Sequence, residues 1–95
     1  MEKSVEHRTD PELLALVGRR LRALRKAQGL TLKDVQRLTG LNPETISRAE
    51  RGLGPTLATV IRLLRAYGRL SALESFIPEP QVSPMMLLRE RRERG

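Results

Sequence analysis

Residues 31–52, TLKDVQRLTGLNPETISRAERG, carry the signals for two short helices joined by a tight turn. Gly40 is expected to end the first helix, because glycine tolerates the positive φ that such a turn requires. Asn42 and Pro43 then start the second helix as its N-cap and first residue. The segment therefore predicts two helices packed through a small apolar wedge. The side chains expected in that wedge are Val35, Leu38, Leu41 and Ile46.

Helical signals continue on the N-terminal side of this pair. Asp10 and Pro11 are expected to form an N-cap and a first-turn proline, and Gly29 is expected to end the helix. Between them, apolar residues follow the spacing of one helical face. They are Leu13, Leu14, Val17, Leu21 and Leu24. Thr31 and Asp34 then have the spacing of a capping box at the start of the central pair.

On the C-terminal side, Thr56 is expected to cap a fourth helix and Ser71 a short fifth one. The apolar set of the fourth helix is Leu57, Val60, Ile61, Leu64 and Tyr67. With one Tyr, one Phe and no Trp, the core must be aliphatic. The sequence predicts an all-α domain of five helices over residues 10–77. A fraying segment at 1–9 and an extension at 78–95, with room for one short helix, flank it.

The chain is strongly basic, and the excess charge lies beside the central pair. Its 95 residues carry 18 Lys+Arg against 11 Asp+Glu, for a net charge of +7. Residues 19–30 alone contribute +5 through four arginines and one lysine. A basic surface favours polyanions, although a cationic protein without such a partner would have the same composition.

The second helix of the pair presents small and charged side chains that suit the major groove of DNA, which admits one α-helix. The outward residues are Pro43, Glu44, Ser47, Arg48 and Arg51, and the first four of these are expected to contact bases. Arg48 could bind guanine O6 and N7, and Glu44 could accept from cytosine N4. Residues suited to the phosphate backbone are Thr31, Lys33, Asn42, Thr45, Arg51 and Thr56. The competing interpretation is an ordinary helical bundle with a solvated polar face.

The segment GLTLKDVQRLTGLNPETISRAERG resembles the XRE/Cro-type helix-turn-helix, most specifically in TISRAERG at 45–52. The resemblance covers roughly residues 13–77. It implies a five-helix, lambda-repressor-like domain whose second and third helices form the motif. It implies base-reading positions at Pro43, Glu44 and Arg48, and a loop at 52–57 near the DNA backbone. It also implies an ion pair between Arg25 and Glu50 that orients the recognition helix.

Three residues depart from the family pattern. Leu32 stands where a phosphate-contacting Gln is usual, and Gln36 replaces a small Ala at the helix crossing. Pro43 removes a donor side chain at a frequent base contact. We therefore expect the DNA backbone to be held by Thr31, Lys33 and the 52–57 loop.

Other functional classes find little support. The chain has no cysteine, which excludes disulfides and thiolate zinc sites, and its one histidine, His7, lies in the N-terminal segment. No catalytic constellation is present, so neither an enzyme nor a cofactor or metal site is expected. No segment approaches the roughly 18 apolar residues of a membrane span. The basic first helix could also lie on a membrane surface, but its apolar stripe is better explained as part of the domain core. We expect a cytoplasmic protein associated with DNA.

The extension at 78–95 contains an apolar cluster before a run of alternating charge. The cluster is Met85, Met86, Leu87 and Leu88. One interpretation is a disordered tail, and the other is a helix that contacts a dimer mate or another protein. The string IPEPQVSPMMLL resembles the tails of regulators encoded beside HipA-like kinase toxins. The leading expectation is a homodimeric repressor on a near-palindromic operator. The alternative is an antitoxin that binds a HipA-like toxin and represses its own operon.

Overall fold

The computed structural model describes residues 4–81 and 84–94, with the side chains at 86, 87, 93 and 94 outside this description. Over this part the chain is helical, as predicted, and contains no strand. One 3-10 turn, η1, lies at Val5–His7, inside the segment expected to fray. The α-helices are α1 (Asp10–Ala27), α2 (Leu32–Thr39), α3 (Pro43–Glu50), α4 (Leu57–Ala66), α5 (Ala72–Phe76) and α6 (Pro84–Arg94).

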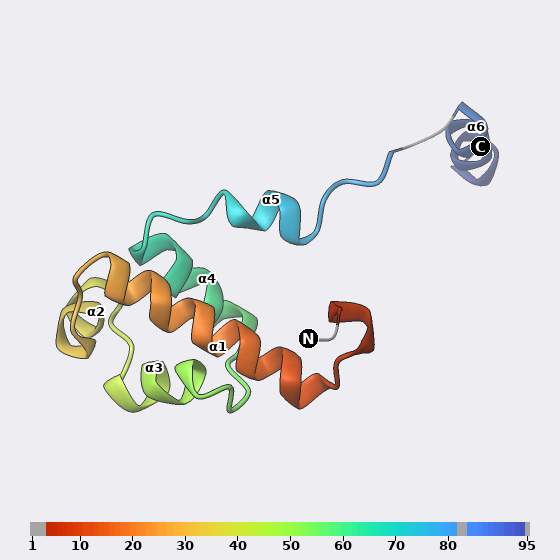
Figure 1. Cartoon of the computed structure of the whole chain (residues 1–95). Helices are drawn as coiled ribbons and strands as arrows, with labels where there is room; N and C mark the ends of the chain where they lie inside the picture. The colour runs from red at the N-terminus through yellow and green to blue at the C-terminus, as the bar shows by residue number, and fades with distance from the viewer. Residues whose placement is uncertain (1–3, 82–83, 95) are drawn as a thin grey trace.

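Helix α1, with 18 residues, is the longest of the described helices, and it packs against α3 (Figure 1). Helix α3 contacts α1, α2 and α4, and α2 also contacts α4. Figure 1 shows α5 beside α4 and places α6 apart from the other helices. Helices α2 and α3 therefore form the predicted pair, held against the rest of the domain by α1 and α4. No helix in the described part of the chain is long and apolar enough to cross a membrane.

Most helix starts follow the predicted capping residues. The Thr31 hydroxyl accepts from the Asp34 N–H and the Asp34 carboxylate accepts from the Thr31 N–H, which completes the capping box. Asn42 caps α3, and Thr56 caps α4 by accepting from the Thr59 N–H. Gly40 adopts the expected positive φ, 75°.

Two capping predictions are wrong. The N-cap of α1 is Thr9, whose hydroxyl accepts from the Glu12 N–H, and Asp10 is already helical. Pro11 is therefore the second residue of the helix and not the first. Proline is tolerated there without its N–H, because none of the first N–H groups of a helix has an intrahelical partner. Ser71 precedes α5 but makes no side-chain capping bond, since its own backbone is helical (φ −59°, ψ −21°).

The core lies where α1, α2, α3 and α4 meet. Its buried apolar residues are Leu21, Val35, Leu41, Ile46, Ala49, Leu63, Leu64 and Tyr67. Leu38 was predicted to lie in this core, but the prediction is wrong: its side chain is 61% exposed. Thr39 occupies the half-buried position one turn after Val35 and donates to the Val35 carbonyl. Leu63 is fully buried and was missing from the predicted set.

Candidate nucleic-acid interface

Helix α3 presents its polar side chains in a single band. It starts at Pro43 because the Asn42 side chain accepts from the Glu44 N–H at 2.8 Å. Residues 44, 47, 48 and 51 are spaced three or four apart, so they share one face of the helix. Glu44, Arg48 and Arg51 on this face are exposed, and Ser47 and Pro43 are half-buried. The structure thus brings the four predicted base-contact residues to one surface.

The opposite face of α3 is anchored in the core. Ile46 is fully buried and Ala49 is 1% exposed. Helix α1 approaches this end of α3 very closely at Gly18, where a Cβ would lie 2.5 Å from the Glu50 carbonyl oxygen and 2.7 Å from that of Ala49. Gly18 is a positioning residue that the sequence analysis missed. A glycine inside a long apolar helical stripe was the available signal, since glycine there lowers helix stability unless packing requires it.

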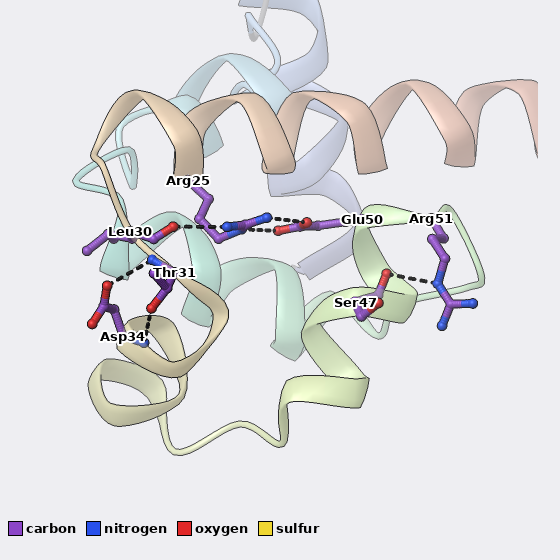
Figure 2. A network of polar contacts seen from close by, with 7 residues as sticks. All are labelled: Arg25, Leu30, Thr31, Asp34, Ser47, Glu50 and Arg51. Carbon is purple, nitrogen blue, oxygen red and sulfur yellow. Dashed lines mark hydrogen bonds and ion pairs between the residues drawn. The ribbon is translucent and has the colours of Figure 1, made fainter.

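The ion pair implied between Arg25 and Glu50 is present and joins the end of α1 to the end of α3 (Figure 2). Arg25 Nε donates to Glu50 Oε2 at 2.7 Å and Nη2 donates to Oε1 at 3.0 Å. Arg25 Nη1 also donates to the Leu30 carbonyl at 2.9 Å. Both side chains are more than nine-tenths buried, and the hydrogen bonds to Glu50 raise the pKa of Arg25. A two-pronged contact of this kind fixes orientation as well as distance.

Tyr67 of the α4 C-terminus completes this buried polar cluster. Its side chain is 1% exposed, and burial, together with the nearby charge of Glu50, raises its pKa to about 12. Its hydroxyl is buried with no hydrogen-bond partner among the described residues. The cluster therefore links α1, α3 and α4 behind the exposed face of α3.

On that exposed face, Glu44 and Arg51 are paired with each other. Arg51 Nη2 lies 2.9 Å from Glu44 Oε1, and Arg51 Nε donates to the Ser47 carbonyl at 3.4 Å. Figure 2 shows the Arg51 side chain beside Ser47. Glu44 was predicted to contact a base and Arg51 a phosphate, and the contact between them was not predicted.

The start of α2 forms the second part of the surface. Thr31 and Lys33 are exposed, and with Lys26 they line an open depression of about 710 Å³. The Thr31 N–H is occupied by the Asp34 carboxylate (Figure 2), and this bond lowers the pKa of Asp34. The amide of Thr31 is therefore not free for a phosphate, and the depression offers Lys26, Lys33 and the Thr31 hydroxyl instead.

The loop after α3 forms the third part. Thr45 and Arg48 of α3 and Thr56 at the start of α4 line a hollow of about 130 Å³. The Thr56 hydroxyl is engaged in capping, because it accepts from the Thr59 N–H and donates to the Thr59 hydroxyl. Leu53, within the 52–57 loop expected near the DNA backbone, also lines this hollow and is 46% exposed.

Comparison with known proteins identifies the family. The Helix-turn-helix family model matches residues 21–74, which is more than half of the chain and includes α2 and α3. The chain belongs to the XRE-type helix-turn-helix family. Its fold is accordingly the lambda-repressor-like helical fold that the sequence predicted.

Two curated relatives carry the name HTH-type transcriptional regulator PuuR, one from Escherichia coli (strain K12) and one from Shigella flexneri. Each is 35% identical over 65 residues, which cover 67% of this chain. The chain spans about a third of the length of these relatives (34%). Members of the XRE-type family are DNA-binding transcription regulators.

The three residues that depart from the family pattern lie in different environments. Leu32 is half-buried and packs against the core, so its side chain serves folding. Gln36 is exposed. Pro43 is half-buried at the start of α3.

The C-terminal extension contributes one exposed helix. Met85 is 70% and Leu88 48% exposed on α6. The side chains of Met86 and Leu87, which belong to the same predicted contact cluster, lie outside the described part of the chain.

Proposed function

We propose that this XRE-type chain is a sequence-specific double-stranded DNA-binding transcriptional regulator whose α3 enters the major groove. The observation that carries the proposal is the exposed band on α3, held from behind by the Arg25–Glu50 pair. Such a band offers donors and acceptors to base edges at a fixed angle. The bases are contacted by Pro43, Glu44, Ser47 and Arg48.

The phosphate backbone is contacted on both sides of α3. The start of α2 is exposed and carries the Thr31 hydroxyl and the Lys33 ammonium as donors, and residues 53, 54 and 56 of the loop before α4 are exposed as well. Contacts of this kind set the register of the protein on DNA without reading sequence. The contacting residues are Thr31, Lys33, Asn42, Thr45, Arg51 and Thr56.

The regulator acts as a homodimeric repressor on a near-palindromic operator and works in the cytoplasm, on DNA. A two-fold dimer would place two recognition helices about 34 Å apart, in successive major grooves. An apolar groove of about 350 Å³ between α1, α4 and α5 supports dimerisation. Val17, Leu57 and Phe76 line it and are 39%, 54% and 64% exposed, so a second copy could bury them.

Selection from a pool of random duplexes tests the DNA-binding proposal. The wild type should enrich a near-palindromic site, and Arg48→Ala should weaken binding to it by about 1–3 kcal/mol and lose the preference at one base pair per half-site. Arg69→Ala is the matched control, because Arg69 is exposed in the α4–α5 connection. Unchanged preference in Arg48→Ala would remove Arg48 from the base-contacting set.

A second candidate function is an antitoxin that binds a HipA-like kinase toxin and represses its own operon. The exposure of Met85 and Leu88 on α6 favours a protein contact there. Deletion of residues 81–95 should then abolish protection against a co-expressed HipA-like kinase and leave DNA binding intact. Equal protection by the full and shortened chains would assign the extension no role in toxin binding.

A further inference from the structure

The side chain of Arg51, the C-cap residue of α3, is held against the helix. Its side chain lies along the helix, with Nη2 2.9 Å from Glu44 Oε1 and Nε 3.4 Å from the Ser47 carbonyl oxygen. Glu44 and Arg51 are seven residues apart, and the carboxylate and guanidinium meet on the exposed band of α3. Their side chains remain 66% and 55% exposed, so a ligand can reach both charged groups while they are paired.

We propose that Glu44 and Arg51 act as one unit that recognises a single C·G base pair in the major groove. The inference rests on the proposed DNA-binding function and changes the role of Arg51 from phosphate contact to base contact. Cytosine presents its N4 amino donor, and guanine presents its O6 and N7 acceptors. In a C·G pair the N4 amino group and O6 are themselves hydrogen-bonded, so this donor and these acceptors are neighbours. A carboxylate beside a guanidinium has the complementary order of acceptor and donors.

The pair retains enough hydrogen-bonding capacity for this role. Arginine has five N–H donors, and the contacts with Glu44 and Ser47 use one on Nη2 and one on Nε. The other donors can face guanine O6 and N7. Glu44 Oε2 has no hydrogen bond within the described residues and can accept from cytosine N4. The base pair can therefore be bound without separating the two side chains.

Electrostatics favour the paired arrangement in the groove. An unpaired Glu44 carboxylate would face the negative potential of the phosphates, and Arg51 at 2.9 Å neutralises it. If Arg51 moved to a phosphate, Glu44 would lose its one ion-pair partner within the described residues as it entered the groove. The contacts with Ser47 and Glu44 also restrict a long side chain before binding, which reduces the entropy lost on contact with a base.

The test compares sequence preferences of Glu44→Gln and Arg51→Gln with those of the wild type, using binding to randomised duplexes. Both variants should lose discrimination at the same base pair of each half-site, from about tenfold or more to near onefold. Preferences at other positions should stay unchanged. Glu79→Gln and Arg69→Gln are matched controls for the loss of one charge at exposed sites outside α3. An unchanged thermal unfolding midpoint in the two variants would show that folding is intact.

A different result for Arg51→Gln overturns the inference while leaving the proposed function in place. If it weakens all duplexes equally and reduces the salt slope by about one, Arg51 contacts a phosphate. Loss of discrimination at two different base pairs for the two variants would also contradict a single unit. A wild type that enriches no sequence would overturn the inference together with the proposed function.

Discussion

At the scale of single residues, the Arg25–Glu50 pair is the feature with the largest expected effect on stability. Glu50→Ala leaves Arg25 charged, more than nine-tenths buried and without its carboxylate partner. We expect a loss of about 3–5 kcal/mol in the free energy of unfolding, measured by urea denaturation. The double variant Arg25→Met/Glu50→Leu should be much less destabilised, because it leaves no buried charge. A loss below about 1 kcal/mol in Glu50→Ala would contradict the burial described here.

Tyr67 makes stability depend on pH in the alkaline range. Its pKa in the folded state, about 12, lies above the ordinary value of 10.0. The unfolded chain therefore releases the phenolic proton first, and stability is lost as pH rises from about 10 toward 12. Tyr67→Phe should show a smaller loss than the wild type over this range, measured by urea denaturation at each pH. Identical pH profiles for the two proteins would contradict the assigned shift.

At the scale of helices, Gly18 sets the distance between α1 and α3. Replacing a glycine inside an exposed helix by alanine normally stabilises it by about 1 kcal/mol. Gly18→Ala should instead destabilise by about 1–3 kcal/mol, because its Cβ would lie within 3 Å of backbone atoms of α3. Thermal denaturation followed by circular dichroism shows whether Gly18→Ala is less or more stable than the wild type. A more stable variant would contradict the close packing of α1 against α3. The same variant should weaken DNA binding, since α3 must shift to admit the methyl group.

The helices also show how far sequence alone can predict this fold. Helix starts were well predicted at Thr31, Asn42 and Thr56, because capping is a local interaction between neighbouring residues. The buried face of each helix was predicted less well. Whether Leu38 and Leu63 are buried depends on which neighbouring element each short helix packs against. The exposed band on α3 follows from spacing, whereas the Glu44–Arg51 contact does not. Two side chains seven residues apart each have several alternative partners in solution, and spacing alone cannot select among them.

For the molecule as a whole, we expect the apolar groove between α1, α4 and α5 to form the interface of the proposed dimer. Phe76→Glu places a charge at a position that is 64% exposed in the single chain and buried in the proposed dimer. Sedimentation velocity should show a dimer for the wild type and a monomer for the variant. Leu38→Glu is the control, because Leu38 is similarly exposed, at 61%, but does not line the groove. Dissociation by Leu38→Glu and not by Phe76→Glu would place the interface elsewhere.

The proposed DNA interface combines base pairs bound by α3 with phosphates held by the basic and polar groups around it. Its most direct test is fluorescence anisotropy of the selected duplex with wild type and Arg48→Ala over a range of salt concentrations. Wild-type affinity should fall steeply, with a log–log slope of about −0.9 per phosphate contact. Arg48→Ala should give a nearly parallel line, weaker by about 1–3 kcal/mol. An affinity that does not change with salt, or coincident lines for the two proteins, would contradict the claim.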